Sequence, residues 1–355
     1  MLRRYRTTMN CHRARTSPEN DAIDMCPLRL LIAICLWLYS ASIFAAVPAN
    51  PLLVGDSVFV SQQGVHRFDL NSGKALWSSL PGVETFEPVA HEGMILVGST
   101  QGLYALAADD GNILWHIEKS KTIFTPNLSG QAFAGSVHGE LYAIDPAQGR
   151  VIWRHQFPGW IYSPVVDEGS ALLWTGGQQH QAYALATQDG SLQHQIATTQ
   201  ETVFSPVDIG NNRVAFNLFD GSSLVIAANS GTVLGVLSGD AQPNDLHRHG
   251  ETVYRSHRDG SLAAFDRIRL DLRWRKSLTA QDLKIHPSQP GYLLASDGDR
   301  ELILLDLGTN GKACRMLAQG NWILPIQIDS LTIVHFQKQM QPPGLKLVQF
   351  RAKCK

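Results

Sequence analysis

A block of about forty residues recurs along most of the chain, and this repeat constrains the fold more than any other feature. One copy reads Leu141-Tyr-Ala-Ile-Asp145-Pro-Ala-Gln-Gly149-Arg-Val-Ile-Trp153. The positions equivalent to Asp145 follow one another at spacings of 38, 38, 41, 41, 39 and 40 residues; they are Asp69, Ala107, Asp145, Ala186, Ala227, Asp266 and Asp306. A fixed period of this length indicates a repeat architecture.

A second marker keeps the same phase. An aromatic residue precedes a proline by two positions ahead of four units, at Phe86, Phe124, Tyr162 and Phe204. Apolar residues alternate with a period of two, and no amphipathic run of helical length follows residue 46. Four short strands per repeat of about 40 residues are typical of a β-propeller.

The repeat arithmetic predicts the number of blades. Residues 46–355 accommodate eight units of about 39 residues. We therefore expect a single all-β propeller of four-stranded antiparallel blades, eight in number, with seven as the alternative. Closing the ring should join the two ends of the chain, so we expect strands from both ends in the last blade.

Composition excludes some functions. The chain carries 30 Lys and Arg against 31 Asp and Glu, a formal charge of −1. Nucleic-acid binders usually show a basic excess, so we expect no nucleic-acid partner. Hydrophobic content of 44% is ordinary for a globular protein.

The first residues differ from the repeat region. Residues 1–24 form a polar, Arg-rich extension, and Met25 is an alternative start. Residues 25–45 combine Arg29 with an apolar run from Leu30 to Ala46, which is typical of a signal peptide. Cleavage after Ala45 or after Ala49 fits, and an uncleaved signal anchor is the alternative. We expect a periplasmic protein, or one anchored to the inner membrane if the signal stays.

Cysteine use adds little. Cys314 and Cys354 are the two cysteines beyond the leader, and they either form a disulfide in an oxidising compartment or remain thiols. Cys26 and Cys35 lie before or inside the apolar run, so no cysteine stands where a lipoprotein would be acylated.

The motif Ala143-x-Asp145-x-x-x-Gly149-x-x-x-Trp153 resembles the PQQ-like, quinoprotein-type propeller repeat. This resemblance implies that the motif residues are structural, with each tryptophan packing between neighbouring blades and each glycine serving a turn. The implied blade-docking residues are Trp77, Trp115, Trp153, Trp274, Gly73, Gly111, Gly149, Gly190, Gly231 and Gly311. His194 and Gly235 replace the tryptophan in two blades, which should weaken docking there.

Two functions share this repeat. Quinoprotein dehydrogenases hold pyrroloquinoline quinone (PQQ) and Ca²⁺, and the resemblance implies for them a Cys-Cys pair that this sequence lacks. The Asp297-Gly-Asp299-Arg-Glu301 stretch is the nearest acidic cluster, and we interpret it as a solvated loop. The chain looks more like the BamB-type scaffolds of outer-membrane protein assembly, apart from the missing lipoprotein cysteine. We therefore expect a monomeric, non-catalytic scaffold for envelope proteins, without cofactor or metal; a PQQ/Ca²⁺ oxidoreductase or sensor is the alternative.

Other candidates for chemistry are weaker. His247, His249 and His257 have a spacing that a metal could use, but their polar surroundings indicate a loop. For partner binding we single out Trp160 and Trp322, which we place on loops at one mouth of the channel, and Arg273 and Arg275 in a basic stretch. Tryptophans that fold into the channel and a solvated basic edge are the alternatives.

Overall fold

The computed structural model describes residues 50–351, apart from short gaps at 168, 240, 280–282, 287, 298–300, 308–311, 318–321, 328–331 and 341–342. The chain divides into two units, Met1–Val47 and Pro48–Lys355, and the described residues all belong to the second. The expected leader segments, 1–24 and 25–45, lie outside the described residues. Within the described ranges, no helix is long and apolar enough to cross a membrane.

All regular elements of the described residues are β-strands, and consecutive strands pair antiparallel into sheets. We call each sheet a blade and number the blades along the chain. Blades 1 to 4 are β1 (Leu52–Val54), β2 (Ser57–Ser61), β3 (Val65–Asp69) and β4 (Ala75–Ser79); β5 (Val89–His91), β6 (Met94–Ser99), β7 (Gly102–Ala107) and β8 (Ile113–Ile117); β9 (Asn127–Ser129), β10 (Gln131–Gly135), β11 (Glu140–Asp145) and β12 (Arg150–Gln156); and β13 (Val165–Asp167), β14 (Leu172–Gly176), β15 (Gln181–Ala186) and β16 (Leu192–Ala197).

Three more four-stranded blades and a three-stranded sheet follow. They are β17 (Val207–Asp208), β18 (Arg213–Asn217), β19 (Ser223–Ala227) and β20 (Val233–Leu237); β21 (Pro243–His249), β22 (Thr252–His257), β23 (Ser261–Asp266) and β24 (Leu272–Ser277); β25 (Lys284–His286), β26 (Tyr292–Ser296), β27 (Glu301–Asp306) and β28 (Lys312–Leu317); and β29 (Trp322–Gln327), β30 (Thr332–Met340) and β31 (Pro343–Arg351). The all-β propeller of four-stranded antiparallel blades is confirmed. Seven blades are complete, which is the alternative count, and the three-stranded sheet follows them as the eighth repeat.

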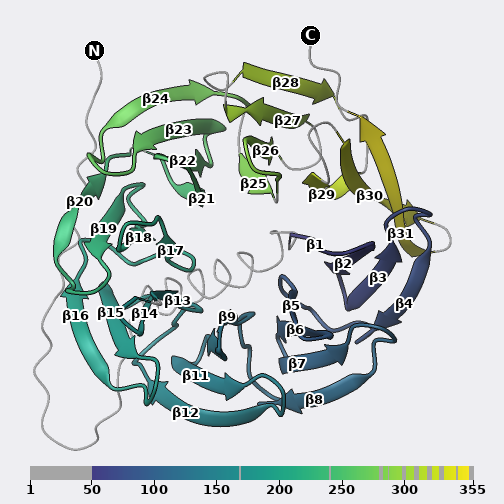
Figure 1. Cartoon of the computed structure of the whole chain (residues 1–355), viewed down its shortest axis with the longest axis horizontal. Helices are drawn as coiled ribbons and strands as arrows, with labels where there is room; N and C mark the ends of the chain where they lie inside the picture. The colour runs from purple at the N-terminus through teal and green to yellow at the C-terminus, as the bar shows by residue number, and fades with distance from the viewer. Residues whose placement is uncertain are drawn as a thin grey trace, which may run out of the picture. The chain divides into compact units, whose positions relative to one another are not determined.

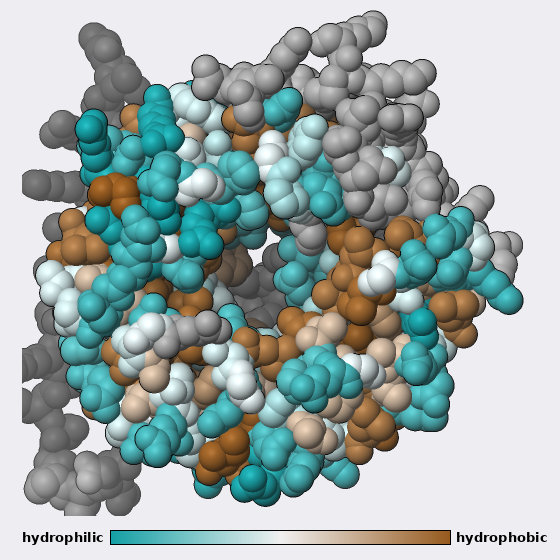
Figure 2. Space-filling model, viewed as in Figure 1, coloured by the Kyte–Doolittle hydropathy of each residue, from teal (hydrophilic) through white to brown (hydrophobic). Residues whose placement is uncertain are grey.

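The blades stand in a ring around a central channel (Figure 1), and the space-filling view shows the opening (Figure 2). The first strand of each blade is innermost and the fourth is outermost. Among the described residues, no blade combines strands from both ends of the chain. Strand β1 pairs with β2 inside blade 1, and blade 8 contains only β29, β30 and β31.

Burial follows the position of a strand within its blade. In blade 3, the third strand Glu140–Asp145 is buried at five of its six positions, because neighbouring blades cover both of its faces. The outer strand Arg150–Gln156 alternates between exposed and half-buried residues, because one of its edges faces solvent. The hydrophobic core therefore lies between blades, as a series of clusters around the ring.

The repeat motif forms one turn and one contact between blades. In blade 3, the Gly149 amide donates to the Asp145 carbonyl at 2.8 Å, and Gly149 has a φ of +67°. The Trp115 ring of blade 2 packs against this turn, so that a Cβ at Gly149 would lie 2.6 Å from the ring. Trp115 Nε1 donates to the Pro146 carbonyl at 3.0 Å. Glycine is needed here both for its φ and for the space.

Two further tryptophans make the same contact with the next blade. Trp77 donates to the Ala108 carbonyl and packs on Gly111, while Trp153 donates to the Thr187 carbonyl and packs on Gly190. Trp274 packs against Tyr254 and the buried cluster around it. Gly73 and Gly231 occupy the equivalent turns, with φ of 69° and 70°, and Gly311 lies outside the described residues.

We expected weaker docking in the two blades that lack the tryptophan. In both blades, however, another side chain supplies a contact with the next blade. In blade 4, His194 packs on Gly231, and it stacks on Trp174 of β14 at 5.9 Å with an interplanar angle of 3°. Trp174 Nε1 donates to the Ala228 carbonyl at 2.9 Å. Ala228 is the position equivalent to Ala108, Pro146 and Thr187, so a tryptophan from a different strand supplies the same hydrogen bond.

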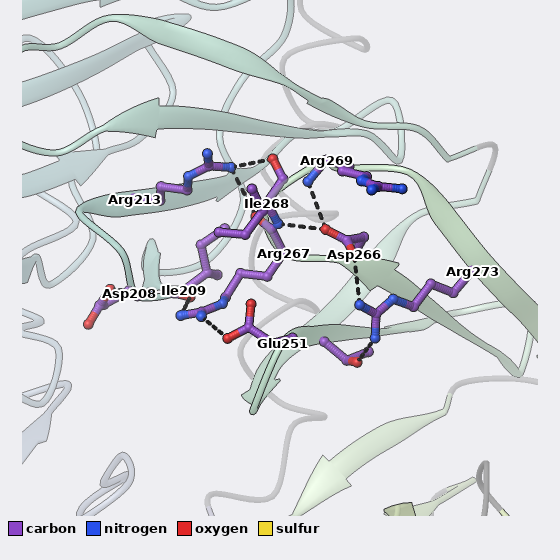
Figure 3. A network of polar contacts seen from close by, with 11 residues as sticks. Asp208, Ile209, Arg213, Glu251, Asp266, Arg267, Ile268, Arg269 and Arg273 are labelled. Carbon is purple, nitrogen blue, oxygen red and sulfur yellow. Dashed lines mark hydrogen bonds and ion pairs between the residues drawn. The ribbon is translucent and has the colours of Figure 1, made fainter.

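In blade 5, Gly235 replaces the tryptophan, and Arg213 of β18 supplies the hydrogen-bond donor instead. Its Nη1 donates to the carbonyls of Arg267 at 3.0 Å and Ile268 at 2.8 Å (Figure 3). Arg267 is the next equivalent of Ala228 in the repeat. Each of the seams from blade 1 to blade 6 is therefore closed by a side-chain donor on this one carbonyl position.

Candidate functional site

Aromatic side chains from successive blades touch one another at the inner end of the ring. Phe86, Phe124 and Tyr162 each precede the innermost strand of their blade. The ring centroids of Phe86 and Phe124 are 5.7 Å apart, and those of Phe124 and Tyr162 are 5.4 Å apart. All three side chains are half-buried. The aromatic-x-Pro marker thus builds an arc of rings across blades 2 to 4.

The fourth copy of the marker is shifted by one residue. Val203 makes the backbone hydrogen bond that Phe86 and Phe124 make in their blades. Phe204 follows with a φ of +64°, a left-handed conformation that is uncommon for a bulky residue. Burial raises the pKa of Tyr162, although a hydrogen bond with the Phe204 backbone acts in the opposite direction. The arc of touching rings therefore ends at Tyr162, which hydrogen-bonds the Phe204 backbone at the start of blade 5. In Figure 2, hydrophobic atoms border part of the central opening.

A polar cluster brings four distant parts of the chain together. It consists of Asn50 before β1, Glu87 before β5, Asp245 in β21 and His286 in β25, and we call it the channel cluster. His286 Nδ1 lies 3.1 Å from Asn50 Oδ1, so this nitrogen donates. The Asn50 side chain also hydrogen-bonds Glu87, and the charge of Asp245 acts on the pKa of Glu87.

Burial dominates the electrostatics of this cluster. Desolvation raises the pKa of Glu87 to about 7, and the Asp245 charge adds to the rise. By its accessible surface, however, Glu87 is an exposed residue. Desolvation lowers the pKa of His286 to about 3, with help from Lys284. The pKa of Asp245 is raised by its burial, although its Oδ2 accepts from the Ile285 amide at 2.9 Å. At neutral pH, His286 is uncharged and Glu87 is poised between its two forms.

Calcium needs six to eight oxygen ligands, whereas no three His, Cys, Asp or Glu side chains of the described ranges converge as a metal site. His247, His249 and His257 are not brought together either; His257 pairs with Arg255 instead. In Asp297-Gly-Asp299-Arg-Glu301, positions 298–300 lie outside the described residues.

Arg255 and His257 form a buried pair in blade 6 that the sequence did not reveal. Arg255 is fully buried; it donates to Ser223 Oγ at 2.8 Å and to the Leu237 carbonyl at 3.0 Å. Its Nε donates to His257 Nε2 at 3.0 Å, which requires a neutral imidazole. Desolvation first, and the Arg255 charge second, lower the pKa of His257 to about 4.

This pair predicts loss of stability in acid. The pKa of His257 in the folded chain lies below the unfolded value of about 6.5, so its contribution is complete above pH 6.5 and is lost as the pH falls towards 4. We expect the wild type to lose roughly 2–3 kcal/mol more than His257→Gln between pH 7 and pH 4. Urea unfolding followed by circular dichroism measures this difference. The exposed His180→Gln should behave as wild type, and identical pH profiles for wild type and His257→Gln would contradict the assignment.

The structure describes the side chain of only one of the two tryptophans chosen for partner binding. Trp160 lies on the loop between blades 3 and 4 and is half-buried. Its carbonyl approaches the turn after β14, where a Cβ at Gly177 would lie 1.8 Å from the oxygen. Trp322 begins β29, and its side chain lies outside the described residues, as do Cys354 and the side chain of Cys314.

Arg273 and Arg275 lie on the outer strand β24, and both guanidinium groups are engaged within blade 6. Arg273 pairs with Asp266 at 2.6 Å (Figure 3), and Arg275 pairs with Asp259 at 2.6 Å. Their side chains are 39% and 29% exposed, so both remain accessible from solvent. A partner would have to share them with these carboxylates.

Comparison with known proteins identifies the family to which the repeat belongs. A family model described as outer membrane protein assembly factor BamB matches residues 39–117 and 99–313, well over half of the chain. This chain belongs to the BamB family. Among curated BamB proteins of this description, that of Burkholderia pseudomallei is 25% identical over 126 residues, and that of Bordetella pertussis is 24% identical over 128 residues. These matches span 34% and 35% of this chain but only a third, 33%, of each relative.

Solved structures agree on the fold. BamB from Moraxella catarrhalis superimposes with a TM-score of 0.66 at 16% identity, over 85% of this chain and 93% of that one. The computationally designed protein Ika8 gives 0.71 at 13% identity, over 85% and 96%. The quinohemoprotein alcohol dehydrogenase ADHIIG from Pseudomonas putida HK5 gives 0.65 at 12% identity, over 87% and 75%. BamB-type and dehydrogenase propellers thus share this architecture, and fold alone does not separate their functions.

Proposed function

We propose that this BamB-family chain is a non-catalytic scaffold of the cell envelope that holds protein partners during outer-membrane protein assembly. The observation that carries the proposal is the family match over residues 39–117 and 99–313, since its description names an outer-membrane assembly factor. The expected signal peptide supports export to the periplasm, where such a scaffold would act.

Features of the surface support protein binding. The outer strands expose large apolar side chains, among them Ile113 and Leu114 of β8 and Val233 and Val236 of β20. Apolar side chains on a rigid surface are typical of protein contacts. Trp160, Arg273 and Arg275 remain candidates for such contacts, since aromatic and arginine side chains dominate binding energy at many interfaces.

A genetic test addresses the function. Deleting the gene in its native host should lower the abundance of outer-membrane β-barrel proteins, and a plasmid copy should restore it. Quantitative mass spectrometry of outer-membrane fractions measures both. Unchanged barrel proteins in the deletion strain would overturn the role in assembly.

The non-catalytic part of the proposal is tested separately. Purified protein mixed with PQQ and Ca²⁺ should show no bound quinone absorption after gel filtration and no dye reduction with alcohols or sugars. A stoichiometric quinone band with substrate-dependent dye reduction would instead make the chain a quinoprotein enzyme.

A further inference from the structure

Three arginines gather where blade 5 meets blade 6. Arg213 begins β18 and donates to the Arg267 carbonyl at 3.0 Å (Figure 3). Arg267 follows β23, and its Nη1 donates to the Ile209 carbonyl at 3.4 Å. Arg248 lies in β21, the innermost strand of blade 6. Gly210, between β17 and β18, is the point on which the side chains of Arg248 and Arg267 converge.

The guanidinium groups of Arg248 and Arg267 approach the same place. A Cβ added to Gly210 would lie 2.2 Å from Arg248 Nη1 and 2.4 Å from Arg267 Nη1. Gly210 is buried, and its amide donates to Asp208 Oδ1 at 2.6 Å. Two guanidinium groups this close repel each other, because both stay charged at any physiological pH.

The carboxylates nearby do not balance this charge. Arg267 pairs with Glu251, whose side chain is 63% exposed. Arg248 is exposed, and no carboxylate of the described ranges lies within ion-pair distance of its guanidinium. Asp208 accepts from the Gly210 amide and forms no ion pair with a described arginine. With Arg213, three positive groups therefore accompany two carboxylates.

The hydrogen-bonding capacity of Arg267 is not used up by the fold. Its side chain is only 9% exposed, yet its buried Nε has no hydrogen-bond partner among the residues that the structure describes. Buried polar groups are nearly always paired, so an exception calls for a physical reason. Here the unpaired donor belongs to an arginine that stands beside a second, unpaired arginine.

The surroundings of the two arginines are basic as well. Residues 248–276 contain eight Lys and Arg but four Asp and Glu, whereas the whole chain carries 30 basic and 31 acidic residues. Blade 6 is therefore a positively charged part of a nearly neutral chain. Such a field attracts anions to this part of the surface.

We propose that the guanidinium groups of Arg248 and Arg267 form a binding site for one oxyanion, the phosphate or carboxylate group of a ligand. Guanidinium N–H donors match both groups in geometry and charge. An anion between the two arginines replaces their repulsion by attraction to a shared charge. Gly210 keeps the space open, because a side chain there would meet both Nη1 atoms. The site goes beyond the scaffold role and does not depend on it.

Arginine-specific labelling tests the site on the purified chain. Phenylglyoxal is applied in chloride, inorganic phosphate or acetate at equal ionic strength, and peptide mapping measures the labelled fraction of each arginine. When an anion fills about nine-tenths of the sites, labelling of Arg248 should slow roughly tenfold relative to chloride. Arg154, an exposed arginine on β12, is the matched control and should label equally in all three salts.

The three salts distinguish the sources of the anion. Protection of Arg248 by phosphate alone assigns the site to a phosphate group, and protection by acetate as well shows that a carboxylate also fits. Equal labelling of Arg248 in all three salts would overturn the proposal. Equal slowing at Arg248 and Arg154 would overturn it too, because the effect would then lie in the reagent.

Two substitutions should shift the affinity in opposite directions. Arg248→Gln removes one guanidinium group and should weaken phosphate binding roughly tenfold or more, as the loss of a charge-assisted hydrogen bond does. Glu251→Gln frees Arg267 from its carboxylate and should strengthen binding. Isothermal titration with inorganic phosphate measures both, and circular dichroism checks that the variants fold.

Arg154→Gln removes the same charge from another blade and should bind phosphate as wild type does. Equal phosphate affinity in wild type and Arg248→Gln would overturn the proposal, as would equal losses in Arg248→Gln and Arg154→Gln. Neither readout requires a protein partner, so the outcome is separable from that of the proposed function.

Discussion

Replacing Trp174 by alanine should lower the free energy of unfolding by about 3–5 kcal/mol, the range typical of deleting a buried aromatic side chain. Trp174 is fully buried, packs edge-on against Phe216 and stacks on His194. It also carries the hydrogen bond to Ala228 that joins blade 4 to blade 5. The alanine variant therefore loses both its packing and the donor at this seam. Urea unfolding at pH 7, followed by circular dichroism, measures the change.

A conservative variant separates the two contributions. Trp174→Phe keeps most of the ring but removes the Nε1–H, so the hydrogen-bond share of its loss should be about 1 kcal/mol. The Trp153→Phe variant removes the equivalent donor in blade 3 and should lose a similar amount. A Trp174→Ala midpoint within error of wild type would contradict the view that Trp174 replaces the missing docking tryptophan.

Gly135→Ala should be the second large effect, with a loss of about 3 kcal/mol, at the upper end of the usual overpacking cost. A Cβ at Gly135 would lie 2.3 Å from the Ile161 carbonyl oxygen and 2.5 Å from the Tyr162 carbonyl carbon, both in the backbone of the next blade. A backbone cannot rotate away as a flexible side chain can, so β10 and the segment before β13 must separate. Thermal or urea unfolding measures this loss.

The matched control uses the same substitution where space is free. At Gly169, the nearest atom to an added Cβ is an Asp167 carboxylate oxygen at 3.8 Å, an ordinary contact. Gly169→Ala should therefore change stability by less than about 0.5 kcal/mol. Equal losses in the two variants would show that the close approach at Gly135 does not decide the packing.

The fold could be predicted from the sequence because its repeat is local. The Asp145–Gly149 turn and the alternation of apolar residues depend on neighbours within one unit, and they recur in phase. The eighth repeat was visible in the length, but the pairing of its strands with the rest of the ring was not. Pairing at the ends of the chain depends on contacts between residues that are far apart in sequence.

The compensation at two seams was missed for a physical reason. Trp174 stands in the second strand, at the position that Phe133 occupies in blade 3, where any large apolar residue fits the pattern. Its indole stacks on His194, and its N–H reaches the Ala228 carbonyl at the seam. An alignment of second strands would have shown one tryptophan opposite one histidine, and that pairing was the available signal.

The channel cluster could not be read from the sequence at all. Asn50, Glu87, Asp245 and His286 belong to four blades and share no motif, and ring closure alone brings them together. By contrast, the aromatic arc was visible as a repeated marker, although only the structure shows that the rings touch. Trp160, Arg273, Arg275 and Trp322 remain predictions for partner binding.

The measurement that tests the central claim most directly is affinity purification of the tagged chain from envelope fractions after cross-linking in cells. An assembly scaffold predicts enrichment of the β-barrel-forming subunit of the outer-membrane assembly machinery over an untagged control. The Trp174→Ala variant should lose this enrichment in proportion to its unfolded fraction. Repeated recovery of the folded chain without any envelope protein would contradict the account.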